Sequence, residues 1–315
     1  MTELLQIGNI TDRMAAALEG RFTRHVLFDQ PDRAAWLSDA GPSIEAILTN
    51  GHYGVPDDVV AALPNLKVVS SYGVGYDAID ATALAARGIK IAHTPDVLND
   101  EVADTVVALW LAVSRGIVAA DRHARSGAWE AGEFRLTRSI QGRRVGVLGL
   151  GRIGQEIANR VKAFRGEVHC HSRTRKPVDY TYHQSPVALA AAVDVLVCIT
   201  PGGAATRHLV NAEVLSALGP DGILINVSRG SVVDERALVA ALKAGTIAGA
   251  GLDVFEDEPK IPDALKAMEN VVLLPHVGSA TVETREAMGD LTVRNLMQWL
   301  ADGTLVTPVP ECRHL

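Results

Sequence analysis

Arg229, Glu258 and His276 are the side chains with the clearest capacity for chemistry, because each follows an apolar run that is typical of a buried strand. In open sheets of parallel strands, ligands bind beyond the carboxyl ends of the strands, so we expect the three side chains to meet at one site. Their types suit the reduction of a 2-keto acid by hydride. Hydride that reaches the carbonyl carbon leaves negative charge on the oxygen, and this charge needs a positioned proton donor.

The imidazole of His276 is the candidate proton donor. A carboxylate beside the ring favours its protonated form and fixes its orientation, and Glu258 suits this task. The planar guanidinium of Arg229 can hold the substrate carboxylate and polarise the carbonyl group. Each residue taken alone has a structural alternative: a histidine at a strand end, an arginine in a salt bridge, or a glutamate in an acidic surface loop. Their occurrence together with the nucleotide motif described next favours the catalytic interpretation.

Residues 145–154 form a short aliphatic run that ends in Gly-x-Gly-x-x-Gly and leads into a helical pattern. This order predicts a strand, a tight turn and the start of a helix. Gly149 allows the turn, Gly151 lets backbone amides approach a pyrophosphate, and Gly154 lets the helix pack closely on the strand. The unpaired amides and the positive dipole end of that helix face the anion. The motif predicts a dinucleotide site, and the alternative is a glycine turn required only for packing.

The segment after the next predicted strand, residues 171–176, decides which dinucleotide is used. Enzymes that use NAD place an Asp or Glu there, about 20 residues after the first glycine, to accept hydrogen bonds from the adenosine ribose. This segment reads His-Ser-Arg-Thr-Arg-Lys and contains no carboxylate. Ser172, Arg173 and Thr174 instead suit a 2′-phosphate, and two charge-assisted hydrogen bonds of about 1.5 to 3 kcal/mol each would favour the phosphorylated cofactor by about 100-fold to 10,000-fold. We therefore predict NADPH, with a solvated basic loop as the alternative.

Composition and charge place the chain in the α/β class and argue against several partners. The length of 315 residues suggests about two domains, and 48% hydrophobic with only 4% aromatic residues suggests the aliphatic interior that covered parallel sheets prefer. A formal charge of -7 gives no global attraction to nucleic acid. Cys170, Cys198 and Cys312 lack metal-ligand spacing, and His169 and His171 have no fitting companions, so we expect no metal. The cysteine usage indicates a reduced, cytoplasmic protein.

Apolar runs of strand type alternate with helical stretches along nearly the whole chain, which predicts two doubly wound α/β domains built on parallel sheets. The predicted strands cover residues 26–28, 44–48, 68–69, 89–92, 145–148, 168–170, 193–199, 223–227, 248–254 and 271–274. A turn and a helix start near residues 94–99 mark a domain boundary. Residues 99–282 are predicted to form a Rossmann dinucleotide-binding domain, inserted in a flavodoxin-like substrate-binding domain of residues 1–98 and 283–315. The active site is expected in the cleft between them, with closure on substrate.

We expect neither a targeting segment nor a membrane span. The N-terminus lacks a basic region followed by a long apolar run, and the most apolar helical pattern, near residues 102–120, carries Asp104 and Arg115. Residues 102–113 of this pattern are apolar on more than one face. This segment is either buried within its own domain or forms a contact between subunits.

Several ordered segments resemble those of the D-2-hydroxyacid dehydrogenase family, and the likeness covers most of the chain. Besides the glycine turn, the matching segments are Gly-Val-Gly-Tyr-Asp at 73–77, Thr-Pro-Asp-Val-Leu at 94–98, Asn-Val-Ser-Arg-Gly at 226–230, Gly-Leu-Asp-Val-Phe-Glu-Asp-Glu-Pro at 251–259 and Pro-His-Val-Gly at 275–278. Within the family, residues 171–177 and 282–285 look most like those of the NADPH-dependent glyoxylate/hydroxypyruvate and hydroxyphenylpyruvate reductases. The resemblance implies reduction of small 2-keto acids to D-2-hydroxy acids.

The resemblance also implies roles for particular residues. It makes Arg229, Glu258 and His276 the catalytic set, and it implies that the backbone amides of Val74 and Gly75 hold the substrate carboxylate, with Arg229 and His276 as further substrate contacts. The expected cofactor contacts are Gly149, Gly151, Arg152, Ile153, Gly154, Ser172, Arg173, Thr174, Thr200, Pro201, Val227 and, toward the nicotinamide carboxamide, Asp253. Formate dehydrogenases of the superfamily carry Gln in place of Glu258, which argues against that activity. The family forms dimers through its nucleotide domains, so a homodimer is expected.

The specificity for the substrate side chain stays open at this point. His52 and Tyr53 either contact the group beyond the keto acid or are ordinary exposed loop residues. Trp129 and Phe134 precede the nucleotide strand and could reach the pocket of a neighbouring subunit. The residues do not decide among glyoxylate, hydroxypyruvate and an aryl pyruvate. A dinucleotide-sensing regulator without turnover is the alternative from another class, although the complete catalytic set favours an enzyme.

Overall fold

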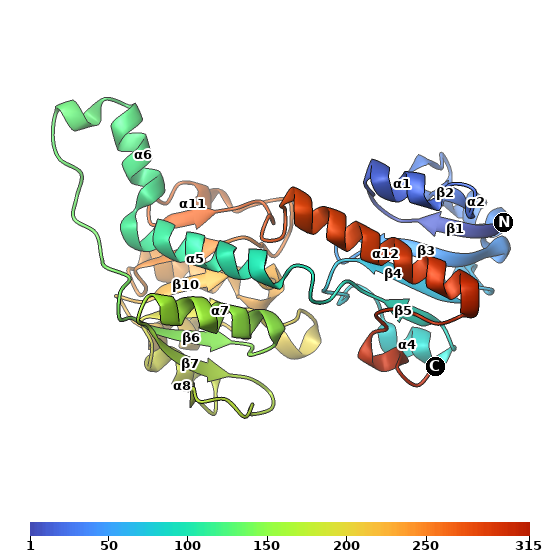
Figure 1. Cartoon of the computed structure of the whole chain (residues 1–315). Coiled ribbons are helices and arrows are strands. Elements are labelled where there is room, and N and C mark those ends of the chain that lie inside the picture. Colours follow the sequence, from blue (N-terminus) through green and yellow to red (C-terminus); the bar gives the residue numbers. More distant parts are fainter. The chain divides into compact units, whose positions relative to one another are not determined.

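The computed structural model describes residues 1–315, which form two compact units (Figure 1). The first unit comprises Met1–Leu98 and Thr281–Leu315, and the second comprises Asn99–Ala280. Each unit contains one parallel β-sheet with helices packed on its two faces. The predicted fold class, two doubly wound parallel-sheet domains with one inserted in the other, is confirmed.

The first unit has a five-stranded sheet in the order β2-β1-β3-β4-β5. Its strands are β1 (Thr2–Gln6), β2 (Phe22–Val26), β3 (Ile44–Asn50), β4 (Val68–Tyr72) and β5 (Lys90–Ala92). The helices on one face are α1 (Asp12–Leu18) and α12 (Val282–Asp302), and those on the other are α2 (Arg33–Ala40), α3 (Asp57–Ala62) and α4 (Ala81–Ala86). The strand order reverses between β1 and β3, and ligands bind at such a reversal in sheets of this type.

The second unit has a seven-stranded sheet in the order β12-β11-β10-β9-β6-β7-β8. Its strands are β6 (Arg144–Leu148), β7 (Glu167–His171), β8 (Thr181–Tyr182), β9 (Val195–Cys198), β10 (Ile223–Asn226), β11 (Gly249–Leu252) and β12 (Val271–Leu273). The helices on one face are α5 (Asn99–Arg115) and α7 (Arg152–Ala163), and those on the other are α8 (Pro186–Ala191), α9 (Ala212–Leu218) and α10 (Glu235–Lys243). Two further helices are α6 (Ile117–Arg125) and α11 (Asp263–Lys266). The order reverses between β6 and β9, beside the glycine turn.

Aliphatic side chains form the interior of the second sheet, as the composition predicts. Leu148, Leu196, Leu224 and Leu252 come from four neighbouring strands, are each 2% exposed or less, and pack in one cluster. Full burial of a leucine contributes about 1.5 to 3 kcal/mol to stability. The strand ends that carry the polar residues are therefore anchored in a well-packed core.

The second strand lies earlier than expected. We expect a strand at residues 26–28, whereas β2 ends at Val26 and Leu27–Asp29 form a 3-10 helix. Arg24 and His25 interrupt the apolar pattern of β2, and this conceals the strand in the sequence. Both side chains hydrogen-bond to polar side chains of the neighbouring strand β1, so their polarity is compatible with the sheet.

Three further elements differ from the expectation. Strands β1 and β8 have no counterpart among the predicted strands, because β1 is half polar and β8 has only two residues. The helical pattern expected near residues 102–120 breaks at Gly116, whose φ of +56° separates α5 from α6. No single helix is long and apolar enough to cross a membrane, although α5 and α6, bent by 60°, meet the length and hydropathy criteria as a pair.

Candidate active site

The glycine turn between β6 and α7 brings three backbone segments close together. Gly149 has a φ of +106°, and a Cβ there would lie 2.8 Å from both the carbonyl oxygen of Ile199 and the amide of Thr200. A Cβ on Gly154 would lie 2.4 Å from the carbonyl oxygen of Gly149. A Cβ on Gly151 would meet no atom within 4 Å. Packing thus requires the first and third glycines, whereas the second leaves the approach to the turn open.

The start of α7 offers donors to an anion. The first residues of the helix are Arg152 and Ile153. The N-cap residue, Gly151, has no side chain that could accept a hydrogen bond from the first amides. Amides in the first turn of a helix have no acceptor within that helix, and the helix dipole adds positive potential there. Thr200, which follows β9, has a buried hydroxyl without a hydrogen-bond partner. An orphaned hydroxyl beside an open glycine and a helix N-terminus fits a dinucleotide, whose phosphates would accept these hydrogen bonds.

Two other expected cofactor contacts lie at neighbouring strand ends. Pro201 is exposed directly after Thr200. Val227, after β10, is only 7% exposed, so its side chain belongs to the core. A ligand at Val227 would therefore meet its backbone.

The basic loop that joins β7 to β8 is held by its own contacts. The Ser172 hydroxyl donates to the carbonyl oxygen of Thr174 at 2.8 Å, and the Tyr182 hydroxyl donates to that of Ser172 at 3.1 Å. The guanidinium of Arg175 lies over the Tyr182 ring, 5.7 Å from its centre. Arg173 is exposed and forms no ion pair. The loop thus presents the Arg173 guanidinium without a competing carboxylate.

The three cysteines are buried, and the histidines near this loop are half-buried. His169 Nδ1 lies 2.9 Å from His183 Nε2, and burial lowers the pKa of both rings. Cys170, Cys198 and Cys312 are buried thiols, and burial raises the pKa of Cys198 to about 12. These thiols stay protonated at neutral pH and are poor nucleophiles.

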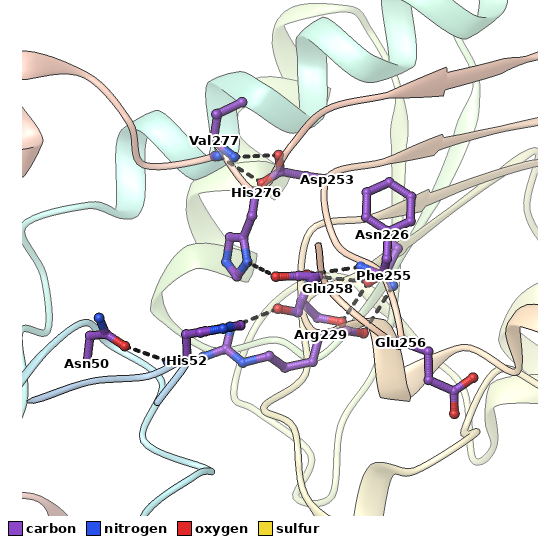
Figure 2. Close-up of polar contacts among 12 residues, drawn as sticks. Asn50, His52, Asn226, Arg229, Asp253, Phe255, Glu256, Glu258, His276 and Val277 are labelled. Atoms are coloured by element: carbon purple, nitrogen blue, oxygen red, sulfur yellow. Dashed lines mark hydrogen bonds and ion pairs between the residues drawn. The ribbon is translucent and has the colours of Figure 1, made fainter. Parts of the chain in front are cut away.

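His276 and Glu258 form a hydrogen-bonded pair (Figure 2). The distance from His276 Nδ1 to Glu258 Oε2 is 2.8 Å, and the other oxygen, Oε1, accepts from the Phe255 amide at 3.0 Å. Because an ionised carboxylate only accepts hydrogen bonds, Nδ1 carries the hydrogen of the pair. The His276 side chain is 46% exposed and that of Glu258 is 20% exposed. This geometry leaves Nε2 as the ring nitrogen that can exchange a proton with a substrate.

The turn that carries His276 is fixed by Asp253. His276 has a φ of +55°, in the left-handed region, and its amide donates to the Asp253 carbonyl oxygen at 2.8 Å. The carboxylate of Asp253 accepts from the amides of Val277 at 2.7 Å and Gly278 at 2.8 Å. Burial raises the pKa of Asp253, and these amides and the charge of His276 oppose the rise. Sequence reasoning assigned Asp253 only to the cofactor and missed this role in holding the turn.

Arg229 is positioned by the backbone around it. Asn226 Nδ2 donates to the Arg229 carbonyl oxygen at 3.1 Å, and Asn226 Oδ1 accepts from the hydroxyl of Ser228 at 2.7 Å. Arg229 Nη1 donates to the Ser228 carbonyl oxygen at 2.9 Å. A Cβ on Gly230 would lie 1.8 Å from the carbonyl carbon of Phe255. Only glycine therefore lets the segment after Arg229 touch the segment that leads to Glu258.

The three predicted catalytic side chains meet at one edge of the second sheet. Arg229, Glu258 and His276 follow β10, β11 and β12, which are neighbouring parallel strands (Figure 2). Their order along the sheet explains why residues so far apart in the chain come together. The arrangement combines a guanidinium, a carboxylate and an imidazole on the sheet that also carries the glycine turn.

The predicted substrate contacts of the first unit lie in the loop after β4. The backbone of this loop is held at two points: the Thr94 amide donates to the Gly73 carbonyl oxygen at 3.0 Å, and His93 Nδ1 lies 2.9 Å from the Val74 carbonyl oxygen. The amides of Val74 and Gly75 make no hydrogen bond within the protein. The two amides are therefore available to an anionic group such as a carboxylate.

The loop after β3 is also ordered. Asn50 Oδ1 accepts from the amides of His52 and Tyr53, both at 3.0 Å. The Tyr53 ring is 5.0 Å from that of Phe28, and Tyr53 is 41% exposed. A Cβ on Gly8 would lie 2.5 Å from the Tyr53 ring. The loop thus presents an aromatic side chain that packs against Phe28 and Gly8 and is partly exposed.

Helix α6 and the segment after it extend away from the second sheet (Figure 1). Large apolar side chains are exposed there: Ile117 by 49%, Val118 by 47%, Trp129 by 69% and Leu136 by 97%. Phe134 is half-buried. A segment this apolar is typical of a surface that another molecule covers.

A dinucleotide-binding turn and an imidazole paired with a carboxylate at the same sheet edge define a dinucleotide-dependent oxidoreductase. Residues 107–278 match the family model described as D-isomer specific 2-hydroxyacid dehydrogenase, NAD binding domain. The chain belongs to the D-isomer specific 2-hydroxyacid dehydrogenase family, and its second unit carries the family's NAD-binding domain.

Similar proteins cover nearly the full chain. The chain is 47% identical over 293 residues to a hydroxyphenylpyruvate reductase from Plectranthus scutellarioides, with 93% of this chain and 94% of the relative covered. It is 46% identical, with the same coverage, to a glyoxylate/hydroxypyruvate reductase from Arabidopsis thaliana. An NADPH-dependent glyoxylate/hydroxypyruvate reductase from Sinorhizobium meliloti, solved with NADP and malonate, is 48% identical, has a TM-score of 0.93, and covers 98% of this chain and 97% of its own.

Proposed function

We propose that this chain reduces glyoxylate and hydroxypyruvate to the corresponding 2-hydroxy acids with NADPH, giving the D form where the product is chiral. The observation that carries the proposal is the 2.8 Å hydrogen bond between His276 Nδ1 and Glu258 Oε2, at the sheet edge that also holds the nucleotide turn. A protein that only senses a dinucleotide has no need for a proton donor paired with a carboxylate. The names of the similar reductases support the same substrate class.

In the proposed mechanism, bound NADPH supplies the hydride, and the side chains of this chain orient and protonate the substrate. Arg229 holds the substrate carboxylate and draws electron density from the keto group. His276 donates a proton from Nε2 to the keto oxygen as negative charge develops there, a contribution of about 100-fold to 10,000-fold in rate. Glu258 stabilises the imidazolium and prevents rotation of the ring. Reduction therefore ends with a neutral imidazole that regains its proton from solvent.

The preference for NADPH rests on the basic loop. Ser172, Arg173 and Thr174 are the proposed contacts to the 2′-phosphate, since Arg173 forms no ion pair and no carboxylate lies in the loop to repel it. The similar reductase that was solved with NADP supports NADPH as the cofactor. The remaining proposed cofactor contacts are Gly149, Gly151, Arg152, Ile153, Gly154, Thr200, Pro201, Val227 and Asp253.

The two units are proposed to divide the work. The first unit contributes the amides of Val74 and Gly75, which contact the substrate carboxylate in addition to Arg229, and the second unit binds the cofactor and supplies the acid. The aryl keto acid hydroxyphenylpyruvate is a second candidate substrate. The relative from Plectranthus and the exposed aromatic pair of Phe28 and Tyr53 support it.

A homodimer is proposed as the assembled form. The exposed apolar side chains of α6 and the segment after it, Trp129 and Leu136 among them, support this proposal because water contact with so much apolar surface is unfavourable. Analytical ultracentrifugation tests it, and a monomer at micromolar concentration would contradict it.

A substrate panel tests the proposed function. NADPH oxidation is followed by the absorbance of the reduced nicotinamide with glyoxylate, hydroxypyruvate and hydroxyphenylpyruvate as substrates. Each measurement is repeated with NADH. We expect turnover of the two small keto acids and a higher kcat/KM with NADPH. Tight NADPH binding without turnover of any keto acid would support a dinucleotide sensor and contradict the proposal.

A further inference from the structure

Glu256, two residues before Glu258, belongs to a cluster of polar side chains with Arg207, His208 and Glu235. Glu256 Oε1 accepts from Arg207 Nη2 at 2.9 Å and is 2.7 Å from His208 Nε2. The amide of Glu256 donates to Oε2 of Glu235, at the start of α10, at 3.3 Å. Glu256 thus connects two segments of the second unit, residues 207–208 and the start of α10, to the loop that carries Glu258.

This loop has little freedom because it is held on both sides. Glu258 Oε1 accepts from the Phe255 amide, so the Glu258 side chain folds back on its own loop. A Cβ on Gly230 would lie 2.3 Å from the Glu256 amide nitrogen, so the loop rests directly on the backbone next to Arg229. The Glu256 side chain points away from Glu258 and His276 (Figure 2). Glu256 therefore anchors the loop from the side opposite the imidazole.

The residues that hold Glu256 are themselves constrained. His208 has a φ of +49°, a conformation that residues other than glycine adopt only when their surroundings hold them. Its amide donates to the Ser231 carbonyl oxygen at 2.8 Å, and the Val210 amide donates to that of Val232 at 3.0 Å. The segment that carries Arg207 and His208 is thus bound to the segment that follows Arg229.

We propose that Glu256, held by Arg207 and His208, is a positioning residue for keto acid reduction, because it fixes the loop that brings Glu258 to His276. The inference rests on the proposed function and deepens it. Glu256 touches neither substrate nor cofactor in this account and acts only through Glu258. Without its two donors on the far side, the loop would shift, and the 2.8 Å contact between Glu258 and His276 would be populated less often.

Variants of the loop test the inference by separating kcat from binding. Glu256→Ala is expected to lower kcat by about threefold to 10-fold, no more than the loss of Glu258 itself, while the keto acid KM and the NADPH Kd change by less than about twofold. Glu256→Gln keeps an acceptor oxygen and is expected to restore most of kcat. Asp257→Ala is the matched control, because it removes a neighbouring exposed carboxylate and is expected to leave kcat unchanged.

A double-mutant cycle with Glu258→Gln gives the decisive readout. If Glu256 acts through Glu258, Glu256→Ala lowers kcat by less than about twofold in the Glu258→Gln background. The inference is overturned if Glu256→Ala lowers kcat by the same factor in the wild-type and the Glu258→Gln backgrounds. A carboxylate with a merely structural role would give that result. Arg207→Ala repeats the cycle from the other side of the contact, at a side chain that is 59% exposed and whose removal spares the core.

The outcomes also separate this inference from the proposed function. A wild-type protein that turns over no keto acid would overturn the proposed function, whatever the variants do. A wild-type protein that is active, with Glu256→Ala equally active, would overturn only the role of Glu256.

Discussion

Replacement of Arg173 by alanine should change the cofactor preference without harming the fold. The guanidinium is exposed and forms no ion pair, so its removal leaves no orphaned carboxylate behind. The loop keeps its other contacts, including the hydrogen bond between Tyr182 and Ser172 and the stacking of Arg175 on Tyr182. Any effect of Arg173→Ala should therefore come from lost contact with the cofactor.

The expected magnitude follows from the strength of a charge-assisted hydrogen bond. Such a bond to a phosphate is worth about 1.5 to 3 kcal/mol, which corresponds to a loss of about 10-fold to 150-fold in kcat/KM with NADPH. NADH has no 2′-phosphate, so its kcat/KM should change by less than about twofold. A cation that does not touch the phosphate, at about 10 Å in water, contributes only about 0.4 kcal/mol before screening by salt.

The assay compares initial rates with NADPH and NADH at fixed ionic strength for the wild type, Arg173→Ala and Lys176→Ala. Lys176 is the matched control because it is an exposed cation of the same loop. We expect a large NADPH-specific loss for Arg173→Ala and about a twofold loss at most for Lys176→Ala. Equal losses with both cofactors, or equal losses in both variants, would refute the assignment of Arg173 to the 2′-phosphate.

Three further predictions address the catalytic pair, the glycine turn and acid stability. Glu258→Gln should lower kcat by about tenfold and move the alkaline limb of the reduction profile to lower pH, since a neutral amide stabilises the imidazolium less; an unmoved limb argues against the pairing. Gly154→Ala should lower the free energy of unfolding in urea by about 1 to 3 kcal/mol and weaken NADPH binding, because its Cβ meets a carbonyl oxygen at 2.4 Å; wild-type values would disprove that contact. Burial opposes ionisation of Asp194, yet hydrogen bonds and charge from Arg144 lower the pKa of Asp194. The ion pair with Arg144 stabilises the fold fully above the unfolded-state pKa of Asp194, about 3.9, and this stabilisation disappears as the pH falls through the lower pKa of the folded state. The Tm of Asp194→Asn should therefore depend less on pH than the wild-type Tm between about pH 5 and 3.

Local patterns in the sequence were sufficient to predict where the short segments proposed for the site lie. The glycine turn, the basic loop and the strand ends before Arg229, Glu258 and His276 are each encoded within about ten residues, in keeping with how short motifs work. The rule that ligands meet at the carboxyl edge of a parallel sheet then brings these segments together. The alternation of strands and helices was likewise sufficient for the fold class.

The features that sequence reasoning missed depend on distant partners. The contact of Glu256 with Arg207 and His208 joins residues about fifty positions apart, and neither end belongs to a motif of known chemistry. The role of Asp253 in the turn at His276 depends on a register between β11 and β12 that no local pattern reveals. Strand β8 has two residues and exists because β7 offers a free edge. Tertiary packing, rather than propensity, decides such cases.

Protonation of the keto oxygen by the His276 imidazolium can be tested by a single-turnover measurement on His276→Asn. Asparagine tolerates the φ of +55° at this position better than alanine, so the turn held by Asp253 should survive the change. NADPH-loaded enzyme is mixed with excess glyoxylate, and the loss of reduced nicotinamide is followed. If His276 is the proton donor, the rate of hydride transfer falls by about 100-fold to 10,000-fold and the NADPH Kd stays within about twofold of wild type. A rate within about threefold of wild type would contradict the account.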